Sequence, residues 1–125
     1  MRHARHYTLD EARAALPWVA SQLASLRDAR ERLTDTEARQ ELADGSAGNG
    51  GGHRGKQVGE AFVELQNRIG EFDRRGIVLR DLDSGLIDFP ALRDGHEVYL
   101  CWLDSEDDIG FWHDLDAGFA GRQPL

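Results

Sequence analysis

The stretch GLIDFPALRDGHEVYLCWLDSEDDIGFWH, residues 85–113, decides the fold of this chain. It contains the single cysteine and two of the three tryptophans, and the pair Asp94-Gly95 separates two apolar runs within it. An Asp-Gly pair between two such runs is a strong signal for a β-hairpin with a two-residue turn. The stretch therefore predicts two antiparallel strands, Leu86–Leu92 and His96–Leu103.

The second of these strands is apolar on both faces. Its side chains alternate, with Val98, Leu100 and Trp102 on one face and Tyr99, Cys101 and Leu103 on the other. A strand of this kind is typical of a sheet that is covered on both sides. We expect helices on one face and the C-terminal tail on the other. Pro90 interrupts the first run, which marks a sheet edge or a bulge there.

A further strand and an irregular tail flank the hairpin. Residues 77–79 are apolar and partly β-branched, and a turn signal follows at residues 83–85, so we expect a three-stranded antiparallel meander. After it, residues 104–108 form an acidic turn and Ile109–Asp114 suggests a short turn of helix. The remaining residues are rich in glycine and predict an irregular C-terminal tail.

The residues before the meander read as helix. Thr8-Leu9-Asp10-Glu11 has the form of a capping box, in which the threonine hydroxyl and the glutamate carboxylate accept hydrogen bonds from free helix amides. Small or apolar residues then recur every three or four positions, which places them on one helix face. They are Leu9, Ala12, Leu16, Val19, Leu23, Leu26 and Leu33. The helix continues to about Ala43, with a kink expected at Pro17.

A second helix is expected from Lys56 to Arg74, ended by Gly76. Its apolar stripe is Val58, Phe62, Leu65, Ile69 and Phe72. Between the helices, residues 44–55 hold six glycines in twelve positions and predict a flexible connector. The prediction is an α+β chain with a single domain over 1–125. A long antiparallel helical hairpin covers 8–75, and the meander and tail cover 76–125.

The charge of the chain is divided unevenly. Residues 1–76 hold 12 acidic and 12 basic residues, whereas residues 77–125 hold 11 acidic residues and three arginines, and so carry the whole net charge of −8. Because nucleic acids are bound largely by neutralising phosphates, this acidic half argues against a nucleic-acid partner. A cation or a basic protein fits it better. The alternative interpretation is that these acidic residues only keep the protein soluble.

Other classes are disfavoured by what the sequence lacks. No apolar run approaches the roughly 18 residues of a membrane span, and the basic N-terminus has no apolar segment behind it, so we expect neither a membrane anchor nor a signal peptide. One cysteine forms no intrachain disulfide, which fits the reducing cytoplasm. We also expect the residues before Thr8 to be disordered.

Four segments resemble a known family. These are YTLDEARAALPWV (7–19), GIVLRDLDSGLIDFP (76–90), GHEVYLCW (95–102) and FWHDLDAGFAGRQP (111–124). Together they are similar to a prokaryotic family of small proteins catalogued as domain of unknown function twenty-two-oh-three. The resemblance covers nearly the whole chain except the glycine-rich connector. It implies no activity, cofactor or catalytic residue.

The acidic half offers one candidate metal site. Asp88, Glu106 and His113 meet if the tail folds back to bury the aromatic residues beside His113, and two carboxylates with an imidazole suit zinc or another divalent metal. The spacing matches no known ligand motif. The alternative interpretation is a surface or hydrogen-bonded histidine. Cys101, flanked by Leu100 and Trp102, is interpreted as a core residue rather than a nucleophile or a soft ligand.

Two functions follow from these patterns. The long helical stripe predicts an interaction or assembly module that forms a homodimer through its helical faces. The alternative is a divalent-metal-binding protein or a metal-dependent enzyme with its site at Asp88, Glu106 and His113. The sequence identifies no catalytic residue and leaves open whether the protein is an enzyme.

Overall fold

The computed structural model describes the backbone of residues 1–44 and 52–125, and side chains in 1–35 and 56–125. Within these residues the chain forms two α-helices, a five-stranded antiparallel sheet and one short 3₁₀ helix. The elements are α1 (Leu9–Asp44), α2 (Gly52–Arg75), β1 (Val78–Asp81), β2 (Leu86–Arg93), β3 (His96–Leu103), β4 (Phe111–Asp114), η1 (Phe119–Gly121) and β5 (Gln123–Pro124). The predicted α+β class is confirmed. The second helix begins at Gly52 rather than at Lys56, so residues 52–55 of the predicted connector are helical, and residues 45–51 of that connector lie outside the described residues.

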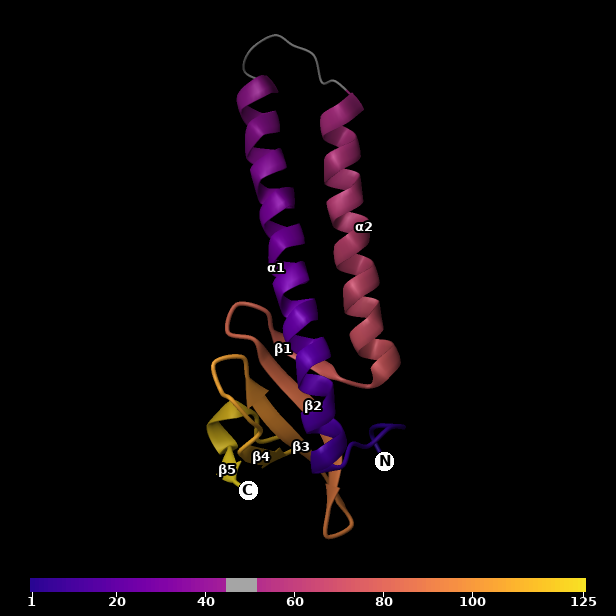
Figure 1. Cartoon of the computed structure of the whole chain (residues 1–125), viewed down its shortest axis with the longest axis vertical. Helices are drawn as coiled ribbons and strands as arrows, with labels where there is room; N and C mark the ends of the chain where they lie inside the picture. The colour runs from indigo at the N-terminus through magenta and orange to yellow at the C-terminus, as the bar shows by residue number, and fades with distance from the viewer. Residues whose placement is uncertain (45–51) are drawn as a thin grey trace.

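The two helices stand side by side and extend well beyond the sheet, which lies at one end of the hairpin (Figure 1). The capping box at the start of α1 is present, since the amide of Glu11 donates to Thr8 Oγ1 (3.1 Å) and the amide of Thr8 donates to Glu11 Oε1 (3.0 Å). The helix runs without a break through Pro17. At the end of α2, Gly76 has φ of 67°, a left-handed conformation that ends a helix at low steric cost.

The sheet is a meander in which every strand pairs with its neighbour in sequence, in the order β1-β2-β3-β4-β5. The hairpin turn has positive φ at both central residues, 52° at Asp94 and 81° at Gly95. This turn pairs β2 with β3 without a shift along their whole length, from Leu86 opposite Leu103 to Arg93 opposite His96. The residue range predicted for β3 is confirmed.

One face of the sheet and the inner face of α1 form the hydrophobic core. The sheet contributes alternate residues of its two longest strands and α1 contributes four residues of its apolar stripe, all at most 6% exposed, while Leu9 and Leu16 of the stripe are partly buried against them. The main members are Ala12, Val19, Leu23, Leu26, Ile87, Phe89, Ala91, Val98, Leu100 and Trp102. The alternation of β2 and β3 therefore turns Asp88, Tyr99 and Cys101 to the other face.

The helical turn predicted for 109–114 is wrong, and the sheet has five strands rather than three. Residues 111–114 form β4 instead, with Phe111 opposite Cys101 and His113 opposite Tyr99. The tail adds β5, which pairs with β4. The physical reason is that β3 would otherwise leave a free edge of unpaired backbone groups, and aromatic residues favour strand over helix.

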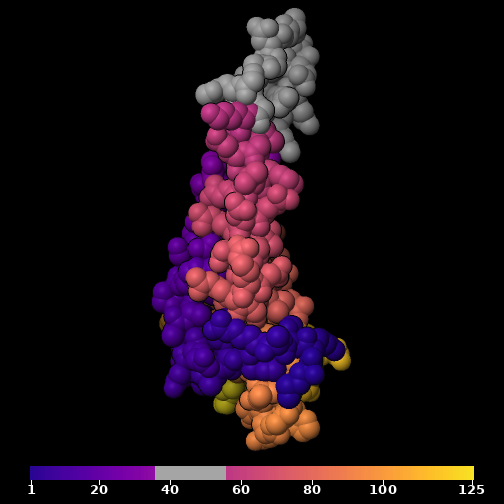
Figure 2. Space-filling view, turned by 90° about the vertical axis from the view of Figure 1, so that its right-hand side faces the viewer, coloured from indigo at the N-terminus to yellow at the C-terminus, as the bar shows by residue number. Residues whose placement is uncertain are grey.

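The N-terminal segment is ordered, contrary to the sequence-based expectation. It crosses the molecule beneath α2 (Figure 2). The amides of Arg2 and His3 donate to the two carboxylate oxygens of Glu97, at 2.6 and 3.0 Å. His6 Nε2 lies 2.9 Å from Glu97 Oε2, and His3 Nε2 lies 2.6 Å from the Tyr99 hydroxyl. These contacts tie the N-terminus to β3.

No helix in the described part of the chain is both long and apolar enough to cross a bilayer.

The contacts around Glu97 predict an acid-dependent loss of stability. The hydrogen bond from His6, together with those from the amides of His3 and Arg2, lowers the pKa of the Glu97 carboxyl from 4.5 to about 2. Because the folded-state pKa is the lower one, this stabilisation is complete above pH 4.5 and is lost as the pH falls towards 2. Urea midpoints measured across this range should fall more steeply for the wild type than for Glu97→Gln. If the urea midpoints of the two proteins fall in parallel with pH, the loss of stability does not come from Glu97.

Candidate functional site

The face of the sheet that lies away from α1 carries a cluster of buried polar side chains. Asp88 of β2, Cys101 of β3 and His113 of β4 are each at most 2% exposed. Asp88 is paired directly with Cys101 across β2 and β3, and His113 is paired with Tyr99 across β3 and β4. Three adjacent strands therefore each place one side chain in the same small volume.

The three side chains are close enough to share one ligand. His113 Nε2 lies 3.0 Å from Asp88 Oδ1. One potential metal-binding atom from each of Asp88, Cys101 and His113 lies within 4.8 Å of the other two. Among the described residues this is the one group of three or more His, Cys, Asp and Glu side chains that meets such a distance limit.

The surroundings of the His113 ring fix which nitrogen carries a hydrogen. Nδ1 lies 2.7 Å from the backbone carbonyl of Asp114, and because a carbonyl only accepts, Nδ1 must donate. In a neutral imidazole the other nitrogen, Nε2, then presents a lone pair to the Asp88 carboxylate. Two lone pairs facing each other at 3.0 Å repel unless a cation lies between them. A proton fits the 3.0 Å separation as a hydrogen bond, whereas a metal ion with bonds of about 2 Å lies off the line between the two atoms.

Cys101 is held as a thiol by its surroundings. Burial raises its pKa to about 12, and the negative charge of Asp88 and the hydrogen bond to Asp88 act in the same direction. A thiol of this kind is a poor nucleophile, because the thiolate is the reactive form. It becomes a ligand only when a metal ion displaces its proton.

Arg80 of β1 completes the cluster and borders an opening to solvent. Its Nε donates to Asp88 Oδ2 at 3.0 Å, and its guanidinium lies 5.0 Å from the centre of the Tyr99 ring. Beside it is a hollow of about 250 Å³ lined by Asp88 and His113 together with side chains from the C-terminal tail. The buried cluster therefore meets solvent on one side.

The structure brings together two of the three metal ligands predicted from the sequence. Asp88 and His113 are in contact, whereas Glu106 accepts hydrogen bonds from Arg122 (2.6 Å) and from the amide of Leu103 (2.8 Å). Glu106 therefore holds the β3–β4 connection. The buried position expected for Cys101 is found, and the same position also puts its sulfur beside Asp88 and His113.

A signal for Cys101 was available in the sequence. A two-residue turn at Asp94-Gly95 pairs the residue six places before it with the residue six places after it, and these are Asp88 and Cys101. Arg80 carried no comparable signal, because its place opposite β2 depends on a register shift between Leu79 and Asp81.

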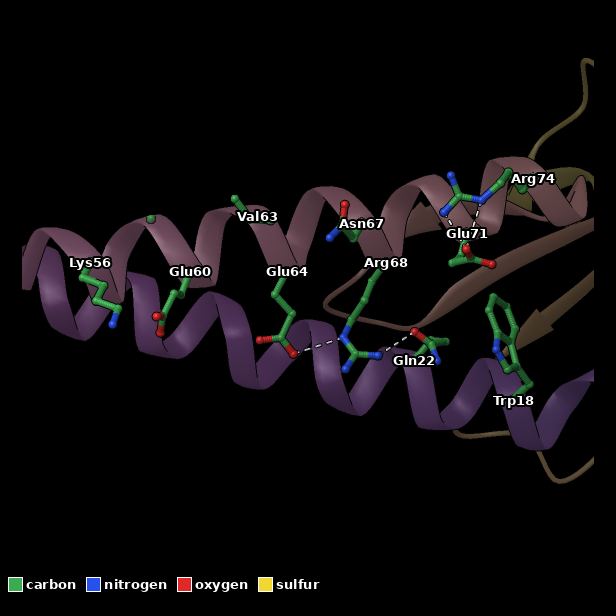
Figure 3. Close-up of a pocket in the computed structure, with 11 residues that line it drawn as sticks. Trp18, Gln22, Lys56, Glu60, Val63, Glu64, Asn67, Arg68, Glu71 and Arg74 are labelled. Carbon is green, nitrogen blue, oxygen red and sulfur yellow. Dashed lines mark hydrogen bonds and ion pairs between the residues drawn. The ribbon is translucent and has the colours of Figure 1, made fainter.

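A larger hollow than the one beside Asp88 and His113 lies elsewhere, between the two helices (Figure 3). This interhelical groove measures about 1080 Å³. Its two arginines are paired: Arg68 donates to Glu64 Oε1 (3.1 Å) and to Gln22 Oε1 (2.9 Å), and Arg74 pairs with Glu71. Because these groups are already paired, we regard the sheet-face cluster as the stronger candidate for chemistry.

Comparisons with known proteins identify the family of the chain but indicate no function. A family model described as an uncharacterized conserved protein, DUF2203, matches residues 5–125. No curated protein and no solved structure matches the chain.

The stabilising effects of Asp88 and His113 should depend on each other. His113→Leu leaves the Asp88 carboxylate buried without one of its partners, and we expect a loss of about 1–3 kcal/mol in the free energy of unfolding. Replacing Asp88 and His113 together by leucine should cost less than the sum of the two single changes, because no buried charge is left behind. The measurement is urea unfolding in the presence of a chelator.

Asp114→Asn serves as the control, because this exposed neighbour contributes only its backbone carbonyl to the cluster. It should unfold like the wild type. If the loss of unfolding free energy in the double variant equals the sum of the losses in the two single variants, Asp88 and His113 are not coupled.

Proposed function

The chain belongs to the DUF2203 family of uncharacterized conserved proteins, and we propose that it binds a divalent transition metal, zinc in the first place, through Asp88, Cys101 and His113. The observation that carries the proposal is the contact between His113 Nε2 and Asp88 Oδ1 at 3.0 Å, with Nδ1 already committed to a carbonyl. A histidine that binds a metal characteristically donates its other ring N–H to a backbone carbonyl or a carboxylate. The hydrogen bond to Asp114 supplies this feature.

The set of donor atoms selects the class of metal. Imidazole nitrogen, thiolate sulfur and carboxylate oxygen together suit zinc and neighbouring transition metals. Calcium and magnesium prefer sites made only of oxygen atoms, so the Cys101 sulfur argues against them. The positive charge of Arg80 lies on the far oxygen of Asp88, which leaves Oδ1 directed at His113.

Three protein ligands leave the fourth position of a tetrahedral metal site open to water or a small molecule. Structural zinc sites usually have four protein ligands, whereas catalytic sites have three and keep one position for water or a substrate. The hollow of about 250 Å³ beside Asp88 and His113 offers space for a small molecule. On this basis we favour a metal site whose fourth ligand is water or a substrate over a purely structural metal site. A single unpaired thiol is kept most readily in a reducing compartment, which supports the cytoplasm as part of the proposal.

A second candidate function is assembly through the helical hairpin. It is favoured by the exposed apolar side chains of α2, of which Phe62 is 52% and Ile69 46% exposed. The acidic half of the chain leaves a basic protein partner as a further prediction.

Zinc titration tests the metal proposal directly. Protein purified without an affinity tag and stripped with a chelator should bind one zinc ion per chain, measured by calorimetry and elemental analysis. Cys101→Ser and His113→Gln should each weaken binding by more than the roughly 10–100-fold that loss of an outer-shell partner costs. Cobalt should give a thiolate-to-metal absorption band that is absent from Cys101→Ser.

Glu106→Gln is the matched control, because Glu106 lies in the same acidic segment but is bonded to Arg122. It should bind zinc like the wild type. If no stoichiometric metal binds and zinc does not raise the melting temperature, the proposal fails. If Glu106→Gln and Cys101→Ser weaken binding equally, the ligand set is wrong.

A further inference from the structure

Helix α2 exposes several large apolar side chains to solvent. Among the described side chains, seven large hydrophobic residues are exposed, and three of them lie on this helix: Phe62 (52%), Val63 (51%) and Ile69 (46%). Isolated exposed apolar residues are normal, so the number alone decides nothing. Their arrangement along the helix is informative.

Phe62 and Ile69 belong to one continuous stripe. Val58, Phe62, Leu65 and Ile69 follow one another at spacings of four, three and four residues, which is the pattern of a helix-packing seam. Leu65 and Val58 are half-buried, whereas Ala61 and Phe72 are fully covered. The stripe therefore runs along the border between the buried face of α2 and solvent, and Phe62 and Ile69 on its outer edge are about half exposed.

The other flank of α2 has a different character. Val63 lies there and lines the interhelical groove together with charged side chains that pair with one another (Figure 3). The flank with Phe62 and Ile69 leads instead to a hollow of about 380 Å³ at the base of α2. Its lining is mainly apolar, with Ile69, Ile77, Val78 and Leu79, and also includes His3 and Asp73. This hollow gives an apolar side chain from outside a place to insert.

The charge of the surface indicates what kind of partner fits. Between residues 56 and 75, α2 carries four basic and four acidic side chains, and residues 1–76 as a whole are electrically neutral. A neutral apolar face does not select a strongly charged partner, but it lets an identical copy approach without repulsion. The acidic residues 77–125 lie mainly at the sheet end of the hairpin. Two copies therefore repel each other least when their sheets lie at opposite ends.

Resting on the second candidate function, assembly through the helical hairpin, we propose that two copies of this chain associate through antiparallel α2 helices, with Phe62 of each copy packed against Ile69 of the other. The two-fold axis then passes between Leu65 and Gln66, so the same contact occurs twice, as a closed symmetric dimer requires. Each Phe62 ring faces the apolar hollow beside the other copy's Ile69. The pairing buries the seam that the single chain leaves open.

Sedimentation of single variants tests the surface. At low micromolar concentration the wild type should sediment with twice the 14.0 kDa mass of one chain. Phe62→Asp and Ile69→Asp should each sediment as monomers. Val63→Asp is the matched control: Val63 is as exposed as Phe62 but lies on the groove flank, so this variant should remain a dimer. Circular dichroism and the melting curve at monomeric concentration check that each variant is folded.

A monomeric wild type would overturn the proposal. A dimer that survives both Phe62→Asp and Ile69→Asp, or one that Val63→Asp disrupts equally, would place the contact on another surface and overturn it as well.

Mixing two variants tests the antiparallel orientation. Antiparallel pairing places residue 62 of one copy opposite residue 69 of the other. A mixture of Phe62→Asp with Ile69→Lys should therefore form a heterodimer, in which one contact becomes an ion pair and the other keeps its native Phe62 and Ile69. Parallel pairing in register sets residue 62 against residue 62 and gives no such rescue. Failure of the mixture to dimerise contradicts the orientation.

Discussion

The register between β2 and β3 is the constraint on which the rest of the structure depends. The two-residue turn at Asp94-Gly95 leaves one way of pairing the strands, and in that pairing Asp88 faces Cys101 while Phe89 faces Leu100. A shift of one residue would turn every side chain of a strand to the opposite face of the sheet. It would bury the Asp88 carboxylate against α1 and send Phe89 into the polar cluster. The hydrophobic core and the candidate site are thus set by the same turn.

The two faces of the sheet are stabilised in different ways. Against α1 the contacts are apolar, and the gain comes from removing that surface from water. On the opposite face the carboxylate of Asp88 is nearly inaccessible, and its burial would be costly without the contacts of Arg80 and His113. A proton between Asp88 and His113 makes the cluster a structural ion pair, and a metal ion makes it a binding site. The same side chains supply the donor atoms in both cases.

Local signals in the sequence predicted most of the fold. The capping box at Thr8, the turn at Asp94-Gly95 and the glycine that ends α2 each act through neighbouring residues, and each is found as predicted. The fourth strand was not predictable in this way, because residues 111–114 form a strand only once β3 offers an edge to pair with. The candidate site shows the same division. Asp88 and Cys101 are related by a hairpin turn, whereas the contacts of His113 with Asp88 and of Glu106 with Arg122 depend on how the tail returns to the sheet.

The most direct test of this account is the protonation of the two ring nitrogens of His113, observed by nitrogen NMR in protein with labelled histidine, before and after zinc is added. If a cation lies between His113 and Asp88 and zinc takes the place of the proton, Nδ1 stays protonated throughout, because it donates to the Asp114 carbonyl. Nε2 then loses its proton when zinc is added and takes the shift of a metal-bound nitrogen. A protonated Nε2 at saturating zinc, or an unprotonated Nδ1 in either state, would contradict it.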